Sequence, residues 1–337
     1  MPLPIEQGGN YLFCCGRGER FMIYHFILNP KSGKKRKDER FENTIKTACQ
    51  SRHLNYHIYY TTSIGDATEY VRSMVKMSTE RQRFICAGGD GTINEIVNSA
   101  PENPNVEFGV IPNGSGNDFS RNFTHAELFR DIDAQIDGDT VSLDLIKCNN
   151  SYCVNMVNIG FDCAVVQEAA RLKRLKLVTP SASYIFGVVV VLFKKYGTKM
   201  KLVFDDGEVI EQELLLTAIA NGQYCGGGFD AAPRALLHDG LMDVCIIDKV
   251  PRLRFLRLVG SYKKGTYLEN AAAMKIIRYR QVPHFRMEFE SPLPVCIDGE
   301  ITGAKSIDFT VVKNGFNFVI PKGSDMRYRT VDDCLKK

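Results

Sequence analysis

The segment Arg83-Phe-Ile-Cys-Ala-Gly-Gly-Asp-Gly-Thr-Ile-Asn-Glu95 runs from an apolar strand through a glycine-rich turn into a helix. Thr92 and Glu95 fit the S/T-x-x-E capping box, so we expect the helix to begin directly after Gly91. The glycines of the turn can adopt positive φ and let a ligand approach the backbone, and the helix N-terminus favours an anion. The segment therefore predicts a phosphate-binding loop.

An acidic residue, Asp90, stands inside this loop. A carboxylate is repelled by phosphate unless a metal ion or water lies between them. The position of Asp90 therefore predicts Mg²⁺ nearby.

The first part of the chain alternates strand-like and helix-like runs, which is the pattern of parallel β-α-β units. The expected strands are Met22–Leu28, Asn55–Tyr60, Arg83–Ala87 and Glu107–Ile111. The expected helices are Glu39–Arg52, Ala67–Met77 and Ile93–Ala100. We interpret this half as a doubly wound parallel α/β domain.

Two further loops follow expected strands, Asn29–Gly33 and Pro112–Asp118. Loops after parallel strands meet at the carboxyl edge of the sheet, where ligands of open α/β sheets bind. Each loop taken singly also fits an ordinary β-to-α turn. The absence of a Walker A pattern and of a complete G-x-G-x-x-G disfavours a P-loop NTPase and an NAD-binding Rossmann domain.

After residue 141 the pattern changes to paired strands joined by tight turns, which predicts an antiparallel β-sandwich. The expected pairs are Val141–Cys148 with Tyr152–Ile159, and Lys199–Phe204 with Glu208–Ala220. The final strands expected are Phe285–Glu290, Pro294–Ile297, Ser306–Val312 and Phe316–Ile320. Helices are expected from about Ala164 to Tyr196, broken at Pro180, and at Arg252–Tyr262. The domains expected are an extension at 1–20, an α/β domain at 21–142 to which 316–330 returns, and a sandwich at 143–315.

Composition excludes several classes of protein. Lys and Arg number 43 against 39 Asp and Glu, so the net charge of +4 gives no support to polyanion binding by bulk charge. The 11 cysteines include no C-x-x-C pair, which disfavours a zinc ribbon or a secreted disulfide framework and fits a reducing cytoplasm. The longest apolar run, Tyr184–Phe193, is shorter than the roughly 20 residues of a membrane-spanning helix.

Several motifs together resemble the diacylglycerol kinase catalytic family, which also contains the sphingosine kinases, and the short bacterial members in particular. In the first half these are Asn29–Gly33, Thr61 with Gly65-Asp-Ala67, Gly88-Gly-Asp-Gly-Thr-Ile-Asn-Glu95 and Gly109–Phe119. In the second half they are Tyr224-Cys-Gly-Gly-Gly-Phe229, Ala232-Pro233, His238–Asp243 and Ile297-Asp-Gly-Glu300. The resemblance implies an α/β nucleotide-binding domain followed by a β-sandwich, with the active-site cleft between them.

The resemblance also implies roles for individual residues. The positions that match ATP-binding positions are Asn29, Pro30, Lys31, Ser32, Gly33, Thr61, Gly88, Gly89, Asp90, Gly91, Thr92, Ile93, Asn94 and Ser115. Glu300 matches the proton acceptor and Asp298 its neighbouring acid, although Asp298-Gly299 also reads as a plain hairpin turn. The stretch with Leu236, Asp239 and Leu241 matches a Mg²⁺ site that uses one carboxylate and two backbone carbonyls.

The function implied is an ATP- and Mg²⁺-dependent lipid kinase that phosphorylates a hydroxyl of diacylglycerol or a related lipid, giving phosphatidic acid or its equivalent. Asp90 would act through Mg²⁺, and Glu300 would accept the hydroxyl proton. The alternatives are a sphingoid base, another lipid or NAD as acceptor, or a non-catalytic nucleotide-binding protein. No motif identifies the acceptor.

The expected partners are the lipid substrate and, transiently, the inner face of the membrane, reached from the cytoplasm. No nucleic-acid partner is expected, and the sequence leaves a homodimer open. Basic clusters alternate with apolar residues at Lys31–Lys37, Arg171–Lys176, Lys194–Lys195, Arg252–Arg257 and Lys263–Lys264. Each reads either as a solvated face or as a membrane-facing patch. The Tyr184–Phe193 run fits an interfacial helix and a buried one equally well.

Overall fold

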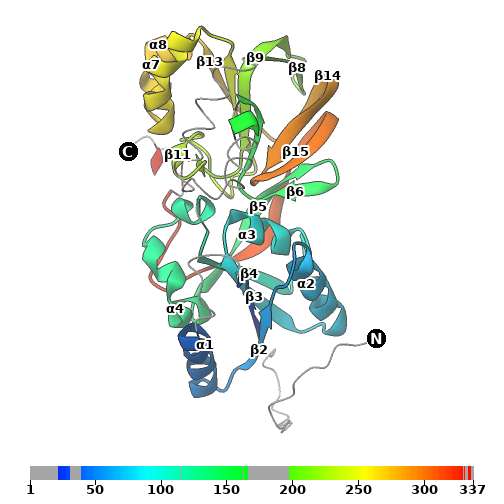
Figure 1. Cartoon of the computed structure of the whole chain (residues 1–337), viewed down its shortest axis with the longest axis vertical. Helices are drawn as coiled ribbons and strands as arrows, with labels where there is room; N and C mark the ends of the chain where they lie inside the picture. Colours follow the sequence, from blue (N-terminus) through cyan, green and yellow to red (C-terminus); the bar gives the residue numbers. More distant parts are fainter. Residues whose placement is uncertain are drawn as a thin grey trace.

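The computed structural model describes residues 22–30, 39–114, 116–161, 163–165, 197–328, 330 and 333–334. Two regions lie one beyond the other along the long axis of the molecule, and strands β5 and β15 run between them (Figure 1). The expected extension at 1–20 lies outside the described residues, as do the Tyr184–Phe193 run and nearly all of the helix expected at 164–196.

The first region is an α/β domain with a parallel sheet in the order β2-β1-β3-β4. Its strands are β1 (Met22–Leu28), β2 (Asn55–Tyr60), β3 (Arg81–Gly88) and β4 (Val106–Pro112). Its main helices are α1 (Glu39–Ser51), α2 (Asp66–Met77) and α3 (Asp90–Val97). The strand order reverses between β1 and β3, which is the point where doubly wound sheets bind ligands.

Both faces of this sheet are covered by helices. In β3, Phe84 and Cys86 pack in the core that contains α2 and α3. Their neighbours Ile85 and Ala87 pack on the opposite face, against α1 and the short helix α4 (Ile132–Ile136). Alternate residues of one buried strand therefore serve two cores, which is why the strands are apolar throughout. The doubly wound fold is confirmed.

The second region is built from antiparallel strands. The strand order is β13-β12-β9-β7-β14-β15, and β8 pairs with both β9 and β14. The strands are β5 (Asp139–Cys148), β6 (Ser151–Cys153), β7 (Met156–Gly160), β8 (Thr198–Phe204), β9 (Val209–Ala220), β10 (Tyr224–Cys225), β11 (Phe229–Asp230), β12 (Met242–Asp248), β13 (Ile277–Val282), β14 (His284–Ile297) and β15 (Glu300–Ile320). One core lies within this β structure, and a second lies between β9, β12 and the helix α7 (Arg252–Lys263). The remaining short helical turns are η1 (Phe119–Asn122), η2 (Ala126–Arg130), η3 (Thr266–Glu269) and α8 (Ala271–Met274).

One strand belongs to both domains. β15 pairs antiparallel with β14 and β5, and its far end then lies parallel to β4, where Asn317 faces Glu107. The two strands expected at 306–312 and 316–320 are therefore one continuous strand with an irregular register. The domain boundary expected at residue 142 falls inside β5.

The hairpin expected from 141 to 159 forms only in part. Its turn at Asn149-Asn150 joins β5 to β6, but β6 ends at Cys153 and β7 pairs with β9 and β14 instead. The pairing stops because the next three backbone N–H groups, at 154–156, donate to a side chain rather than to a strand. Among the described residues, none of the helices combines the length and apolar composition needed to cross a bilayer.

Phe318, near the end of β15, carries much of the contact between this strand and the first domain. Its buried ring packs against Phe119, Phe123 and Phe129. Phe318→Ala should lower the free energy of unfolding by about 3 to 5 kcal/mol through the cavity it leaves. Urea titration followed by circular dichroism measures this.

The matched control is Phe318→Leu, which keeps an apolar side chain and should cost less than about 1.5 kcal/mol. If Phe318→Ala were no worse than a surface substitution, the end of β15 would not hold the two regions together.

Candidate active site

The loops that follow β1, β3 and β4 are joined by backbone hydrogen bonds. Asn29 N donates to Ala87 O at 3.4 Å, and Asn113 N donates to Gly88 O at 2.8 Å. The carboxyl ends of these parallel strands therefore meet at one edge of the sheet, beside the point where the strand order reverses. This edge also holds the loop after β2, which begins at Thr61.

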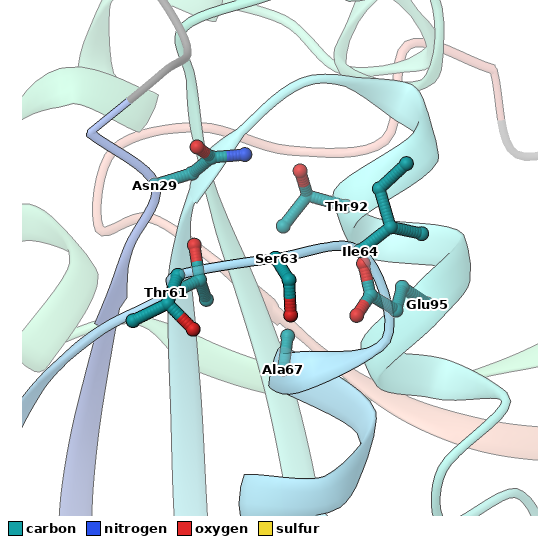
Figure 2. A pocket seen from close by; sticks show the side chains of 8 residues that line it. Asn29, Thr61, Ser63, Ile64, Ala67, Thr92 and Glu95 are labelled. Atoms are coloured by element: carbon teal, nitrogen blue, oxygen red, sulfur yellow. The ribbon is translucent and has the colours of Figure 1, made fainter.

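A cavity of about 100 Å³ opens at this edge. Figure 2 shows Asn29 and Thr61 at the strand ends facing Thr92 and Glu95 on α3. The cavity is lined by Asn29, Thr61, Thr62, Ser63, Ile64, Ala67, Thr92 and Glu95. It is smaller than the roughly 300 Å³ of a complete small-molecule pocket, so it can enclose only part of a nucleotide.

The glycine-rich turn differs from its prediction in where the helix begins. α3 starts at Asp90, with Gly89 as N-cap and no side-chain cap bond. The backbone oxygen of Gly89 accepts from Thr92 N at 3.0 Å, which already closes the first turn. Glu95 instead accepts from Thr68 N on α2 at 3.4 Å. The expected capping box is therefore wrong.

Gly88 and Gly89 of the turn are required for close packing rather than for positive φ. Gly88, Gly89 and Gly91 all lie outside the left-handed region, so that expectation is also wrong. A Cβ on Gly89 would lie 3.1 Å from the Cα of Gly114 in the loop after β4. The backbones of the two loops are therefore in direct contact, which is possible because neither Gly89 nor Gly114 has a Cβ atom.

Two carboxylates border the same space beside this turn. A Cβ on Gly116 would lie 2.9 Å from Asp90 Oδ2 and 3.1 Å from Asp118 Oδ2. Asp90 Oδ1 also accepts from Phe119 N at 3.0 Å. Burial, together with the charge of Asp118, raises the pKa of Asp90 to about 6. Burial likewise raises the pKa of Asp118 above its ordinary value.

Asp118 is not among the site residues predicted from the sequence. Its position could have indicated a role, because it ends the loop after one parallel strand, as Asp90 stands in the loop after β3. A divalent cation suits this pair of side chains, because a buried pair of carboxylates gains from a positive charge. Mg²⁺ commonly takes one or two carboxylates and completes its shell with phosphate and water. Within the described ranges, no group of three or more acidic, His or Cys side chains gathers to hold a metal without such help.

Asp298 is a buried carboxylate that accepts five hydrogen bonds. The donors are Asn94 Nδ2 at 2.7 Å, Cys153 Sγ at 3.2 Å, Val154 N at 2.6 Å, Asn155 N at 3.0 Å and Met156 N at 2.9 Å. Burial nevertheless leaves its pKa above the ordinary value. Asp298 therefore joins α3 of the first domain to the turn between β14 and β15 of the second.

The turn at Asp298-Gly299 is a tight hairpin, which is the second of the two interpretations of this dipeptide. Asp298 and Gly299 both have positive φ, of 47° and 94°, and Ile297 pairs with Glu300 across them. Glu300 is exposed, and its Oε1 would lie 3.6 Å from a Cβ on Gly91. The turn therefore carries the predicted base to the glycine-rich loop.

Of the remaining predicted site residues, some have side chains in the protein interior, one is exposed, and the others lie outside the described residues. Ile93 is buried in the core, and the Asn94 amide donates to Asp298 and to Tyr152 O, so both side chains serve the protein interior. Pro30 is exposed next to Asn29. Lys31, Ser32, Gly33 and Ser115 lie outside the described residues.

The second predicted metal site lies in the loop before β12. Asp239 Oδ1 accepts from Leu241 N at 2.9 Å, and the side chain of Leu236 is buried. Burial raises the pKa of Asp239, and the charge of Asp144 adds to the effect. A carboxylate with main-chain oxygens is a donor set that suits a hard cation.

Comparison with known proteins agrees with this fold. Residues 24–148 match the family model "Diacylglycerol kinase catalytic domain", and residues 155–319 match "YegS C-terminal NAD kinase beta sandwich-like domain". A diacylglycerol kinase from Staphylococcus epidermidis is 30% identical over 303 residues, which cover 88% of this chain and 91% of that protein. A diacylglycerol kinase from Bacillus subtilis is 26% identical over 302 residues, covering 88% and 95%.

A solved structure shows the same fold. The crystal structure of a diacylglycerol kinase from Bacillus anthracis superposes with a TM-score of 0.66 at 20% identity, covering 90% of this chain and 99% of that one. The family models and the relatives define the class as two-domain proteins of the diacylglycerol kinase type. This chain belongs to the diacylglycerol kinase catalytic family, together with the bacterial diacylglycerol kinases and YegS-like lipid kinases.

Asp90 should destabilise the folded protein when it is charged. Because its pKa is about 6 in the folded state against 3.8 ordinarily, the wild type loses stability as the pH rises from about 4 to about 6. Asp90→Asn removes this loss, so the variant should be more stable at pH 8 in EDTA by about 2 to 3 kcal/mol. Below pH 4 the two proteins should be equal. Urea unfolding across this pH range measures the difference.

The matched control for Asp90 is Asp308→Asn, the same substitution at a half-exposed position on β15, which should change stability at pH 8 by less than about 1 kcal/mol. Mg²⁺ should narrow the gap between Asp90→Asn and the wild type. A variant that is less stable than the wild type at pH 8 would contradict the account of Asp90.

Asp298→Asn places an NH₂ group where the carboxylate now accepts. One donor then faces another, so the variant should lose about 2 to 4 kcal/mol of stability. The exposed Asp-Gly turn between β8 and β9 offers the control, Asp206→Asn, whose loss should be clearly the smaller of the two because water screens this carboxylate. Equal losses in thermal and urea unfolding would mean that the five donors contribute little.

Proposed function

We propose that this protein is an ATP- and Mg²⁺-dependent lipid kinase that phosphorylates a hydroxyl group of diacylglycerol or a related lipid. One observation carries the proposal: a carboxylate from the second domain, Glu300, lies at the glycine-rich turn of the first. A base beside a phosphate-binding turn is the arrangement that phosphoryl transfer to a hydroxyl needs.

The donor nucleotide would bind at the edge of the parallel sheet. Backbone N–H groups at the start of α3 would hold its phosphates, because that end of a helix has unpaired donors and a positive dipole. Asn29 and Thr61 line the adjoining cavity and would contact another part of the nucleotide. Lys31, two residues after Asn29 in the sequence, would add a positive charge.

Asp90 and Asp118 would hold Mg²⁺, which when bound neutralises charge on the transferring phosphoryl group. The two carboxylates are preorganised by main-chain donors, Phe119 N for Asp90 and Gly227 N for Asp118. The Gly227 bond ties a loop of the second domain to the first, so the metal site and the domain junction share a residue.

Glu300 would accept the proton of the lipid hydroxyl as its oxygen attacks the terminal phosphorus of ATP, and the bond from that phosphorus to the bridging oxygen would break to release ADP. Its carboxylate is exposed, so an acceptor can reach it from solvent or from a bilayer. Asp298 is a positioning residue, because its five hydrogen bonds fix the turn that carries Glu300. It does not share the proton-accepting step.

The acceptor is proposed from the family. The named relatives are diacylglycerol kinases and YegS-like lipid kinases, so a diacylglycerol-like lipid at a membrane surface is the acceptor we favour. A protein with this substrate would work from the cytoplasm and contact the inner face of the membrane transiently. The site at Leu236, Asp239 and Leu241 would then hold a second Mg²⁺ at the domain that bears the acceptor.

The substrate is tested by a phosphate-transfer assay with radiolabelled ATP. Mixed micelles would present diacylglycerol, monoacylglycerol, a sphingoid base and undecaprenol in turn, and NAD would be assayed in solution. We expect transfer to diacylglycerol or a related lipid that is abolished by EDTA. Transfer to NAD alone, or to none of the panel, would contradict the proposal.

Glu300→Gln should lower kcat by about 10² to 10⁴-fold, because the amide cannot accept the hydroxyl proton. KM for ATP should change little, since the side chain is proposed to act on the acceptor. Glu269→Gln, at an exposed glutamate in η3, is the control and should retain full turnover. Near-wild-type turnover in a folded Glu300→Gln protein would remove Glu300 from the mechanism.

A further inference from the structure

Helix α7 is basic and contains no acidic residue. Its sequence, Arg-Leu-Arg-Phe-Leu-Arg-Leu-Val-Gly-Ser-Tyr-Lys, has four cationic side chains, and Lys264 follows directly. Phe255 and Tyr262 anchor the helix in the core beneath β9 and β12. One face of the helix is therefore fixed, and the other turns away from the protein.

The outer face of α7 is formed by Leu253, Leu256, Arg257, Gly260 and Lys264. These positions follow an i, i+3, i+4, i+7, i+11 spacing, so they share one side of the helix. Leu253 is 72% exposed and Leu256 is 52% exposed. Two exposed leucines thus lie at the N-terminal end of a face whose other members are cationic or small.

Several cations on the sheet of the second domain are held in ion pairs, unlike three cations of the α7 segment. On the sheet, Lys201 pairs with Glu288 at 3.0 Å and Arg278 pairs with Asp248 at 2.6 Å. Within the part of the chain that the structure describes, Arg254, Arg257 and Lys264 form no ion pair. Their charge is therefore available to an anionic partner.

Exposed apolar and basic side chains also follow α7 in the chain. Met274 on α8 is 40% exposed, and Lys275 beside it is exposed. Both helices lie at the outer end of the second domain, far from α1 and β2 (Figure 1). Exposed aliphatic side chains among cations are the arrangement of helices that rest on anionic bilayers.

The C-terminal end of α7 adjoins the domain junction. Lys263 Nζ lies 5.4 Å from the ring centre of Phe229. Phe229 ends the glycine loop 226–228, and Gly227 of that loop donates to Asp118. A surface in contact with α7 would therefore adjoin the loop that reaches the candidate metal site.

We propose that the outer face of α7 docks on the surface of an anionic lipid bilayer, with Leu253 and Leu256 entering the interface and Arg257 and Lys264 contacting headgroups. The inference deepens the proposed function, since a lipid substrate is what makes a bilayer the partner. It requires no residue of the candidate active site. It can therefore be tested by binding alone.

The test is flotation of the full-length protein with vesicles of phosphatidylcholine, with and without phosphatidylglycerol, over a range of salt concentrations. We expect binding only to the anionic vesicles and release at high salt. Each basic residue near such a surface contributes roughly fivefold to affinity, so Arg257→Glu with Lys264→Glu should weaken binding at least 25-fold. Leu253→Ser with Leu256→Ser should weaken it even at low salt.

The matched controls lie on α2, in the first domain (Figure 1). Arg72→Glu with Lys76→Glu makes the same charge change on an exposed helix, and Met77→Ser removes an apolar side chain that is 76% exposed. Both should bind vesicles like the wild type. Equal loss in the α2 and α7 variants would show a response to net charge and overturn the proposal.

Two further outcomes separate this proposal from its rivals. If the α7 variants bind vesicles normally but change the sedimentation coefficient, a second copy of the chain covers this face and the proposal is wrong. Turnover on a water-soluble short-chain diacylglycerol should persist in the α7 variants. If the wild type phosphorylates no lipid yet binds vesicles through α7, the proposed function fails while the docking face stands.

Discussion

The buried carboxylate of Asp298 is the interaction on which the arrangement of the site depends. Its five donors come from α3 and from residues 153–156, so one side chain holds together a helix of the first domain and two strand connections of the second. A carboxylate this far from water is stable only when its oxygens are satisfied by hydrogen bonds. The position of Glu300, two residues away, follows from that requirement.

Strand β15 connects the two domains directly, because it pairs with strands of both. It begins at the turn that carries Glu300 and ends beside β4 in the core of the first domain. The first half of β15 pairs with β14, and its second half, from Phe309 to Ile320, pairs with the whole of β5. Glu300 of the second domain and the glycine-rich turn of the first are therefore brought together by a strand that pairs with both domains.

Two carboxylates at the site are held in place although burying them is electrostatically unfavourable. Asp90 and Asp118 are held close together and away from water, and the pKa of each is raised as a result. Main-chain donors from 119 and 227 keep both carboxylates in place. This is the pattern expected where a protein sacrifices stability to prepare a site for a cation.

The sequence by itself determined the doubly wound domain, the antiparallel second domain and the loops that form the site, because strand and helix periodicity and glycine-rich turns are local signals. Four parallel strands appear within two residues of their predicted ends. Predictions from the sequence were wrong where a group far away in the chain takes a hydrogen bond or contact that a neighbouring residue was expected to make. The hairpin arm at 154–156 gives its N–H groups to Asp298, Glu95 turns to α2 instead of capping α3, and the turn glycines meet another loop. Only the tertiary structure paired Asp118 with Asp90 and turned Leu253 and Leu256 outward, since both depend on contacts between segments far apart in the chain.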